Sequence, residues 1–175
     1  MKIKKCRNCK RKFLTELFSL GNLCFTGKFH KNGSNVKSDI LTIVICDKCK
    51  LVQLDRNFNL NYLFNKDYGY RSGINKTMRN HLKKTIRYAE KKSQLKEGER
   101  VLDIASNDGT LLNYYKVKNI VRVGVDPVLN KFRNNYININ FKFPNFFDLR
   151  FLKHKIFNKK FKIVTALAVF YDLED

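Results

Sequence analysis

The sequence predicts a mixed α/β fold in which a small cysteine-rich domain precedes a parallel β-sheet covered by helices. Two Cys-x-x-Cys pairs predict the first part, and an amphipathic helical pattern over residues 75–93 connects it to the second. From Arg100 onward, short apolar runs alternate with helical segments, which is typical of parallel strands joined by crossover helices. We therefore expect a zinc-binding domain at residues 1–70, a linker helix at 71–97 and an α/β domain with the parallel sheet at 98–175.

Short apolar runs in the first part predict strands at residues 41–45 and 51–54. The connecting helix is predicted by apolar residues that recur every three to four positions, with Lys and Arg on the other face. These apolar residues are Ile74, Met78, Leu82, Ile86 and Ala89. Gly98 is expected to end the connection, because glycine commonly closes such segments.

Four apolar runs predict the parallel strands of the second part. They are residues 101–105, 120–125, 139–143 and 161–167. Short helices are expected from Gly109 to Lys116, with Leu111 and Leu112 facing inward, and from Leu129 to Asn135.

The composition bounds the class of protein and its partners. Hydrophobic residues make up 43% of the chain, which indicates a globular protein rather than a disordered one. No apolar run approaches the roughly 20 residues that cross a bilayer, and no signal peptide is recognisable, so we expect a cytoplasmic protein without a membrane partner. The net charge of +21 comes from 26 Lys and 10 Arg spread along the chain. A genome with AT-rich codons explains this pattern, and an anionic partner remains the alternative.

The cysteines predict a metal site. Cys6 and Cys9 form one Cys-x-x-Cys pair, and Cys46 and Cys49 form another. Two such pairs can supply the four thiolates of a tetrahedral zinc site, and four protein ligands leave no open position, so we expect a structural Zn²⁺. Unrelated free thiols or a redox-active pair are the alternatives. Cys24 has no partner at metal-ligand spacing and is expected to be a small buried hydrophobic residue.

The turn after the first parallel strand and the end of the second strand together form a candidate ligand site. The run Asp103-Ile104-Ala105-Ser106-Asn107-Asp108-Gly109 has the form of a strand end, a tight turn and a helix start. Asp126 ends the next strand, where a carboxylate can accept both ribose hydroxyls of a nucleoside. Phe147 and Asp148 follow the third strand, where an adenine ring could meet an aromatic face and a carboxylate. A turn and a strand end without a ligand is the alternative.

The order of these motifs resembles the sugar C-methyltransferase family, which methylates NDP-4-keto-deoxysugars at C3. The resemblance covers nearly all 175 residues. It is carried by the two Cys-x-x-Cys pairs and by the segments Leu51–Leu54, Asp67–Gly73, Val101–Leu112 and Gly124–Pro127. Members of the family have an amino-terminal zinc-binding domain, a central class I methyltransferase domain and a carboxy-terminal domain. The resemblance therefore implies a small zinc-binding domain followed by an incomplete class I (Rossmann-like) methyltransferase domain, truncated after the fourth strand.

The resemblance also implies a cofactor, S-adenosyl-L-methionine, and a nucleotide-sugar substrate. Asp103 would face the methionine amino group, and Gly109 would let the helix start pack close to the strand. The complete set of cofactor-binding residues that we expect is Tyr70, Asp103, Ser106, Asn107, Gly109, Asp126, Phe147 and Asp148. Tyr68, Arg71 and Ser72 are expected, with Tyr70, to lie over the cofactor or the sugar.

Two departures from the family pattern bear on function. Ala105 replaces the usual first glycine of the loop, and its Cβ would crowd the methionine part of the cofactor. The family's catalytic Tyr and His-Glu-His stretch lies beyond the fourth strand, so we expect no catalytic residue in this chain. Tyr68, Tyr70 and His81 are the only helpers that the sequence offers.

Three hypotheses remain open at the level of sequence. The first is an enzyme, or its amino-terminal half, that methylates a carbon next to the ketone of a nucleotide-linked deoxysugar. The second is a zinc-ribbon protein that binds nucleic acid or methylates RNA, although nucleic acid is the less favoured partner. The third is a non-catalytic module that binds S-adenosyl-L-methionine, or one half of a split enzyme that a second chain completes.

Overall fold

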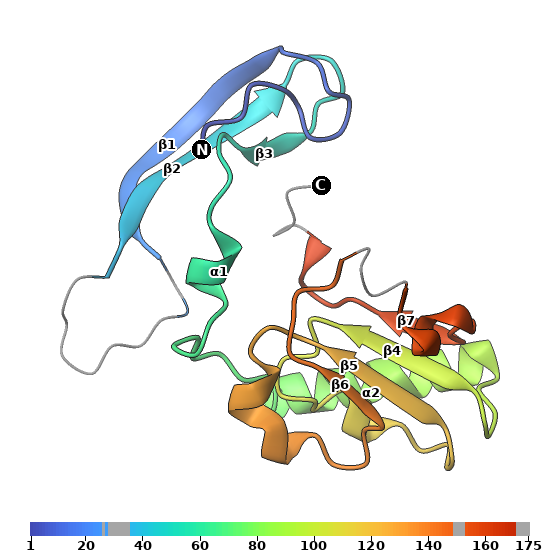
Figure 1. Cartoon of the computed structure of the whole chain (residues 1–175). Coiled ribbons are helices and arrows are strands. Elements are labelled where there is room, and N and C mark those ends of the chain that lie inside the picture. The colour runs from blue at the N-terminus through green and yellow to red at the C-terminus, as the bar shows by residue number, and fades with distance from the viewer. Residues whose placement is uncertain (26, 28–35, 149–152, 171–175) are drawn as a thin grey trace. The chain divides into compact units, whose positions relative to one another are not determined.

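The computed structural model describes residues 1–25, 27, 36–148 and 153–170. The described residues divide between two compact units, one up to Gly69 and the other from Tyr70 onward (Figure 1). Each unit has its own sheet, three-stranded and antiparallel in the first and four-stranded and parallel in the second. The chain is therefore a mixed α/β protein with a parallel sheet, as predicted.

The first unit consists of a long hairpin, a short third strand and one helical turn. Its elements are β1 (Leu14–Cys24), β2 (Ser38–Cys46), β3 (Val52–Leu54) and α1 (Leu60–Leu63). The predicted strands at 41–45 and 51–54 correspond to β2 and β3. Along β2, burial alternates toward its end, where Thr42, Val44 and Cys46 are buried, so this strand carries the inward face of the sheet.

Strand β1 was not predicted from the sequence. Its leucines recur every third residue, from Leu14 to Leu23, which does not match the two-residue period of a strand. The pairing of β1 with β2 is irregular at two places that absorb this mismatch, between Glu16 and Phe18 and between Ser19 and Asn22. The expectation of a buried Cys24 is wrong, because this residue ends an edge strand and is exposed.

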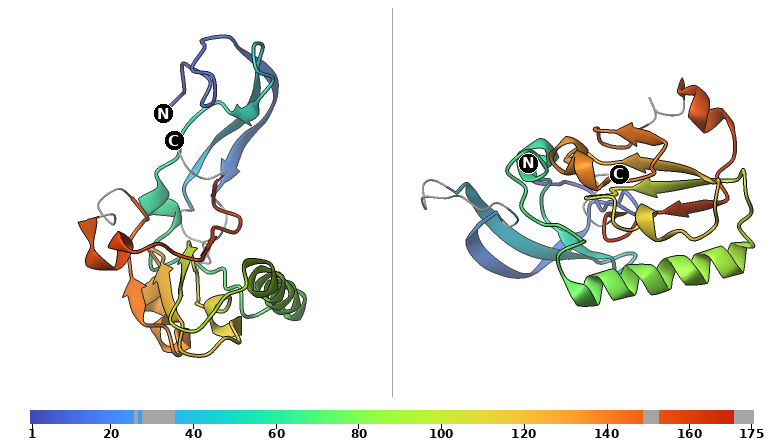
Figure 2. Two further views of the ribbon diagram at one scale, coloured as in Figure 1. Left: turned by 90° about the vertical axis from the view of Figure 1, so that its right-hand side faces the viewer. Right: turned by 90° about the horizontal axis from the view of Figure 1, so that it is seen from below.

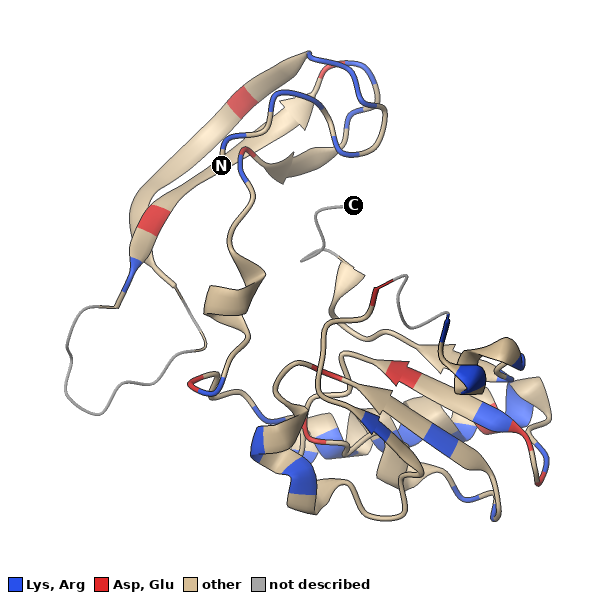
Figure 3. Cartoon of the chain, in the orientation of Figure 1, with Lys and Arg blue, Asp and Glu red and all other residues tan. Residues whose placement is uncertain are grey.

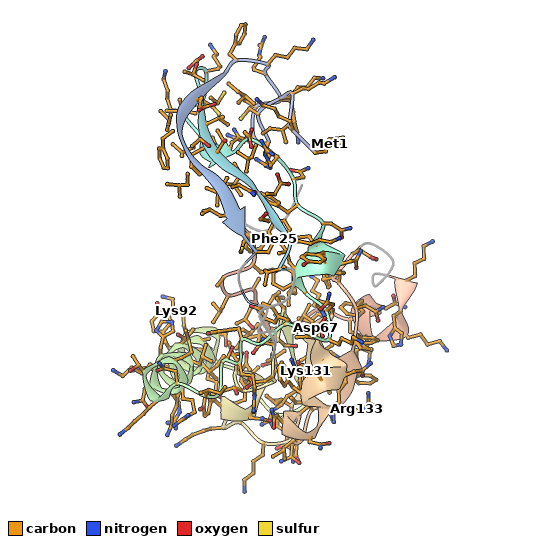
Figure 4. The ribbon with its side chains drawn as sticks, turned by 90° about the vertical axis from the view of Figure 1, so that its left-hand side faces the viewer. Met1, Phe25, Asp67, Lys92, Lys131 and Arg133 are labelled. Atoms are coloured by element: carbon orange, nitrogen blue, oxygen red, sulfur yellow. The ribbon has the colours of Figure 1, made fainter. Side chains whose placement is uncertain are left out.

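Aromatic packing closes the far end of the hairpin. Phe25, labelled in Figure 4, follows β1 directly. Its ring centroid lies 5.4 Å from those of both Phe58 and Tyr62. The Phe58 contact is edge-on, which is a favoured arrangement for two aromatic rings. Tyr62 belongs to α1, whose first turn is capped by the Asn59 side chain accepting from the Asn61 backbone N–H at 3.0 Å. The cluster therefore ties the end of β1 to the segment that contains α1.

The sheet of the second unit has the strand order β6-β5-β4-β7, with every pair parallel. The strands are β4 (Arg100–Ile104), β5 (Val121–Val125), β6 (Phe141–Phe143) and β7 (Ile163–Thr165). All four correspond to predicted strands, although β6 and β7 are shorter than expected. The carboxyl ends of the four strands lie at one edge of the sheet, which is where α/β proteins usually bind ligands.

Helix α2 (Lys76–Ser93) confirms the predicted helix and lies along one face of this sheet (Figure 2). It begins at Asn75, whose side chain accepts from the backbone N–H groups of Thr77 at 2.8 Å and Met78 at 3.2 Å. It ends at Gln94, which has a left-handed conformation. Leu82 and Ile86 are buried, so the apolar stripe read from the sequence is the packed face.

The opposite face of the sheet is covered by the 3-10 helix η4 (Lys155–Asn158). Ile156 packs there against Leu102, Val123 and Val125, with Phe143, Phe157 and Phe161 at the margin of the cluster. Side chains alternate between the two faces of the sheet along β4. Leu102 therefore lies in this apolar layer, and Asp103 lies on the other face together with Gly124 of β5.

Two sequence expectations need correction in the second unit, and a third, the short helix at Leu129–Asn135, is confirmed as a 3-10 helix. The helix expected from Gly109 to Lys116 is only the 3-10 turn η1 (Leu112–Tyr114), although Leu111 and Leu112 are buried as expected. The helix expected at Leu129–Asn135 is the 3-10 helix η2 over those residues, interrupted by non-helical backbone at Phe132. The fourth strand stops at Thr165 rather than Leu167, and it pairs with β4 along one side as the edge of the described sheet.

The described helices and the basic side chains bear on membrane crossing and on the distribution of charge. Within the described ranges, no helix combines the length and the apolar character that crossing a bilayer requires. Lys and Arg occur in both units, along α2 and around the turns that hold the cysteines (Figure 3). The basic charge is therefore spread over the chain, as its sequence indicates.

Candidate functional site

The two Cys-x-x-Cys segments form the same backbone turn. In the first, the Cys6 N–H donates to the Arg11 carbonyl oxygen at 2.8 Å, and the Lys10 N–H donates to the Cys6 carbonyl oxygen at 3.0 Å. The second turn repeats both bonds at the same spacing, Cys46 N–H to Leu51 O at 2.9 Å and Lys50 N–H to Cys46 O at 2.8 Å. Lys10 and Lys50 both have a left-handed backbone, with φ of 59° and 62°. This shared turn brings both sulfurs of each pair to one side.

The four sulfurs meet at distances that suit one metal ion. The Sγ atoms of Cys9 and Cys46 are 3.5 Å apart, those of Cys6 and Cys49 are 3.6 Å apart, and all four lie within 4.8 Å of one another. A tetrahedral ion with Zn–S bonds of about 2.3 Å separates its sulfurs by about 3.8 Å, so little movement is needed. Cys6 and Cys46 are buried, and the other two are partly exposed. The four predicted metal ligands can therefore hold an ion such as zinc.

The surroundings of the first turn favour a thiolate at Cys6. Burial raises the pKa of the Cys6 thiol, but the backbone N–H groups of Cys9 and Asn8 and the Gln53 side chain outweigh it and lower that pKa to about 6. At Cys9, the backbone N–H of Arg11 lowers the pKa, whereas burial and the neighbouring sulfurs raise it to about 11. Neighbouring thiolates thus repel one another, and a divalent cation would relieve that repulsion.

In the second unit, Asp103 and Asp126 lie at the adjacent carboxyl ends of β4 and β5. Asp103 is in β4, opposite Gly124 on one side and Thr165 on the other, and Asp126 directly follows β5. Both are buried, with relative exposures of 3% and 5%. The sequence therefore predicted correctly that these two carboxylates share one edge of a parallel sheet.

The carboxylate of Asp103 is held by one hydroxyl group. Thr165 Oγ1 donates to Asp103 Oδ1 at 2.6 Å and also lies 3.3 Å from the Leu102 carbonyl oxygen. Burial raises the pKa of Asp103 to about 7, and the Asp126 charge adds to this rise, while the Thr165 bond opposes it. A positive group beside Asp103 would therefore be bound favourably near neutral pH.

Both oxygens of Asp126 accept backbone hydrogen bonds. The Asn107 N–H donates to Oδ2 at 2.8 Å, and the Val128 N–H donates to Oδ1 at 2.7 Å. Burial raises the pKa of Asp126 to about 6, with a further rise from the Asp108 charge, although these two N–H groups lower it. Each carboxylate oxygen keeps a second lone pair, so an oriented Asp126 can still accept hydroxyl groups.

The loop between β4 and η1 has an unusual backbone. Ala105, Asn107 and Gly109 all have positive φ angles, of 57°, 50° and 75°. Gly109 is required by packing as well, because a Cβ there would lie 3.0 Å from the ring of Tyr136. Ser106 is 4% exposed, and its Oγ is bonded to the Tyr136 hydroxyl at 2.9 Å. The predicted residues Ser106 and Gly109 thus shape the loop from inside.

The side chains of Asn107 and Asp108 fasten the segment 70–73 to this loop. Asn107 Oδ1 accepts from the Ser72 N–H at 2.9 Å, and its Nδ2 donates to the Tyr70 carbonyl oxygen at 3.2 Å. Asp108 Oδ2 accepts from the Gly73 N–H at 3.0 Å. The amide of Asn107 therefore holds a neighbouring segment, and through it places Tyr70, which is 45% exposed, next to the loop.

Arg71 adds a charge to the same junction. Its Nε lies 3.6 Å from Asp108 Oδ2, and its guanidinium carbon lies 5.3 Å from the centroid of the Phe132 ring. Asp108 is 1% exposed, so the ion pair offsets one buried negative charge at this end of the sheet. Asp103 and Asp126 carry no such ion pair within the described residues.

The remaining predicted residues lie after β6, on helix α2 and in the first unit. Phe147 and Asp148 follow β6, the strand beside β5, and Phe147 is 37% exposed with its ring 6.1 Å from that of Phe157. His81 is exposed on α2, and Tyr68 belongs to the first unit, where its ring packs 5.1 Å from Phe64. Tyr70, another of the predicted helpers, is fastened to the loop after β4 by the bond between its carbonyl oxygen and Asn107 Nδ2.

Sequence reasoning missed Tyr136, the residue on which the loop rests. It is 2% exposed, and its ring approaches the positions where Gly109 and Gly124 would carry a Cβ. The two glycines were visible in the sequence, but nothing in the sequence linked them to one aromatic ring between η2 and β6. The site can be described as two buried carboxylates beside a strained, supported loop, which suits a cationic ligand that also carries hydroxyl groups.

When the chain is compared with models of known protein families and with curated protein sequences, none matches it.

Proposed function

We propose that the second unit binds S-adenosyl-L-methionine and serves methyl transfer to a carbon next to the ketone of a nucleotide-linked deoxysugar. We further propose that the four cysteines hold a structural Zn²⁺. The observation that carries the proposal is the pair Asp103 and Asp126, buried side by side at the ends of two parallel strands. The proposal joins this geometry to the family resemblance of the sequence and assigns the unit a Rossmann-like, class I methyltransferase fold.

Charge complementarity supports this cofactor. S-adenosyl-L-methionine carries a positive sulfonium and a positive ammonium group, and one carboxylate. Burial raises the pKa of Asp103 to about 7 and that of Asp126 to about 6, and repulsion from Asp126 at the first group and from Asp108 at the second adds to the rise. A bound cation would offset that repulsion, and it would gain strength from the low local dielectric.

The remaining parts of the cofactor have matching groups. The second lone pairs of Asp126 would accept the two ribose hydroxyls, because its carboxylate is already oriented by Asn107 and Val128. Phe147, which follows the neighbouring strand and is 37% exposed, would contact the adenine ring. In this assignment Ser106, Asn107 and Gly109 act mainly by shaping the loop and the adjoining segment that holds Tyr70.

The metal ion has a structural role in this proposal. Four cysteine ligands fill a tetrahedral shell and leave no position for a substrate or a water molecule. The ion would join the turn before β1 to the turn between β2 and β3, and so would hold a small sheet in which β1 is largely exposed. Small domains with little buried apolar area commonly depend on such a staple.

The chemistry that this unit would serve requires more than the cofactor. A ketone acidifies the neighbouring C–H, a base removes that proton, and the resulting enolate attacks the sulfonium methyl group. We assign neither the base nor the group that stabilises the enolate oxygen to the described residues. The proposal for the described chain is therefore cofactor binding, with the keto-sugar nucleotide as the acceptor class.

A second candidate function, nucleic-acid binding, is favoured by one face of α2. Exposed lysines recur along this helix beside Tyr88, which is 68% exposed; they are Lys76, Lys83, Lys84, Lys91 and Lys92. Basic side chains with an exposed aromatic ring are suited to a polyanion with bases that can stack. Affinity for generic RNA that falls steeply between low and physiological salt would support this candidate.

Calorimetry with S-adenosyl-L-methionine and with its demethylated product tests the first proposal. We expect one site per chain, and we expect Asp126→Ala to weaken binding by about 10- to 100-fold, since about 1.4 kcal/mol corresponds to a factor of ten. Asp67→Ala is the matched control, because Asp67 is exposed in the first unit. Absence of binding heat for both compounds at millimolar concentration, with a folded chain, would overturn the proposal.

A further inference from the structure

The side chain of Gln53 lies between the metal-ligating Cys6 and the backbone of Arg7. Gln53 Nε2 is 3.3 Å from Cys6 Sγ, and Gln53 Oε1 is 3.0 Å from the Arg7 backbone nitrogen. The backbone N–H of Arg7 can only donate, so the atom facing it must be the carbonyl oxygen of the amide. The NH₂ group of Gln53 must then face the sulfur, which fixes the direction of the N–H···S hydrogen bond.

Arg7 holds this amide a second time through its guanidinium group. Arg7 Nη1 donates to Gln53 Oε1 at 3.3 Å and to the Leu54 carbonyl oxygen at 2.7 Å. Arg7 Nη2 donates to the Arg56 carbonyl oxygen at 3.0 Å and to Asn57 Oδ1 at 2.6 Å. Arg7, a residue of the first cysteine turn, is thus fastened to β3 and to Arg56 and Asn57 beyond it.

The two cysteine turns differ at this position although their backbones match. Asp47 corresponds to Arg7, and its backbone N–H donates to the Phe13 carbonyl oxygen at 3.1 Å rather than to a side chain. The Asp47 carboxylate accepts from Thr15 Oγ1 at 2.9 and 3.0 Å, which ties the second turn to β1. In the first turn, therefore, a side-chain amide from β3 donates to a cysteine sulfur, whereas the second turn is joined to β1 through the Asp47 carboxylate.

Burial makes the Gln53 contact costly to lose. Gln53 is 9% exposed and Cys6 is 0% exposed, so a thiolate at Cys6 is largely shielded from water. Gln53 donates to this sulfur in addition to the backbone N–H groups of Cys9 and Asn8, and removing one donor from a buried, charged acceptor costs free energy. Hydrogen bonds to metal-bound thiolates also lower the charge on sulfur and fix the ligand geometry.

We propose that Gln53 is a positioning residue of the metal centre, which donates a hydrogen bond to the Cys6 thiolate while Arg7 holds its amide in the required orientation. The inference rests on the proposed metal binding by the four cysteines and adds β3 to the metal centre. It predicts that metal affinity depends on an uncharged side chain that is not itself a ligand.

Competition with a chromogenic chelator measures the zinc affinity of the full chain and of three variants. We expect Gln53→Ala to weaken zinc binding by about tenfold and Gln53→Glu by up to about 100-fold, because a carboxylate would face the thiolate. Val52→Ala is the control, since Val52 is in the same strand and is 53% exposed. Affinities of the Gln53 variants within twofold of the Val52 variant would overturn the inference.

Cobalt substitution gives a second readout that a general loss of stability would not move. With Co²⁺ at saturation, Gln53→Ala should shift the sulfur-to-metal charge-transfer band to lower energy, because the sulfur loses a hydrogen-bond donor. Val52→Ala should leave the band in place. An unshifted band in Gln53→Ala would count against a hydrogen bond to the ligating sulfur.

The wild-type chain offers a test that requires no variant to fold. In ¹¹³Cd-loaded protein, a side-chain amide proton of Gln53 should show scalar coupling to the metal across the N–H···S bond. Absence of this coupling in a well-resolved spectrum would overturn the inference. If instead the wild-type chain binds neither zinc nor cadmium, the metal proposal itself fails, which is a distinguishable outcome.

Discussion

Tyr136 lies beneath Asn107, with its phenol hydroxyl donating to the Asn107 carbonyl oxygen at 2.8 Å. The same hydroxyl is bonded to Ser106 Oγ at 2.9 Å, so one buried group supports two consecutive residues of the loop. Asn107 has a positive φ of 50°, which most residues adopt only at a cost. The loop after β4 is therefore held in a strained form by a residue from beyond η2.

Tyr136→Phe should weaken both the fold and the ligand site. The ring would still fill the space under Gly109 and Gly124, but Ser106 Oγ and Asn107 O would lose their partner. We expect a loss of about 1–2 kcal/mol in the free energy of unfolding and weaker binding of S-adenosyl-L-methionine. Thermal unfolding and calorimetry measure the two effects. Tyr88→Phe, at an exposed position on α2, should change neither, and equal behaviour of the two variants would refute the role of Tyr136.

Ala105→Gly should stabilise the chain, which is unusual for this substitution. Ala105 has φ of 57°, a conformation that glycine adopts without the clash of a Cβ. We expect a gain of about 0.5–1 kcal/mol in the free energy of unfolding, together with tighter binding of S-adenosyl-L-methionine, because the Cβ no longer crowds it. Denaturant unfolding measures the first effect. Ala89→Gly, inside α2, should instead cost about 1 kcal/mol, and a loss of stability in both variants would contradict strain at Ala105.

The sequence was sufficient for the regular parts of the fold. Helix α2 could be predicted because its apolar residues follow a helical period and face a sheet. Strands β4 and β5 were predicted because strands of a covered parallel sheet are mostly apolar, as these two are. Strand β1 could not, since most of its residues are exposed and its leucines follow a period of three. The helix expected at Gly109 gave way to a 3-10 turn, because the loop before it is held by tertiary contacts.

The site was predictable where its residues follow strand ends or repeat a metal-ligand spacing. Cys6, Cys9, Cys46 and Cys49 were identified by spacing alone, and Asp103 and Asp126 by their places at the ends of two predicted strands. Residues that act on these groups from other elements, such as Gln53 and Tyr136, have no local signature. Their roles depend on long-range contacts that a pattern of nearby residues does not contain.

Asp103→Asn should raise stability near neutral pH while abolishing cofactor binding. The folded chain keeps a proton on Asp103 from the ordinary pKa of 3.8 up to about 7, so wild-type stability falls as pH rises through this range. Each pKa unit is worth about 1.4 kcal/mol, so removing the charge at pH 8 should gain on the order of 2–4 kcal/mol. Asparagine retains an oxygen for the Thr165 hydroxyl. Melting temperatures of the variant and of wild type from pH 5 to 8 measure this stability difference. A variant less stable than wild type at pH 8 would show that the buried Asp103 charge does not destabilise the fold.

Asp126→Asn should behave differently although it removes the same charge. The Asp126 carboxylate accepts the N–H groups of Asn107 and Val128 on separate oxygens, and an amide offers one oxygen and one NH₂ group. One of the two N–H donors would face another donor, at a cost of about 1–3 kcal/mol that offsets the relief of charge. We expect no gain in melting temperature over wild type at pH 8. A gain equal to that of Asp103→Asn would indicate that these two backbone bonds contribute little.

Cys46→Ser should abolish metal binding, whereas Cys24→Ser should preserve it. Cys46 Sγ lies 3.5 Å from Cys9 Sγ inside the four-cysteine cluster, while Cys24 is exposed at the end of β1. Elemental analysis should find about one zinc ion per wild-type chain and per Cys24→Ser chain, and far less in Cys46→Ser. Metal binding should also weaken as pH falls, because protons compete with the ion for the thiolates. Equal zinc content in the two variants would show that the metal is held elsewhere, since both changes remove one sulfur from the same unit.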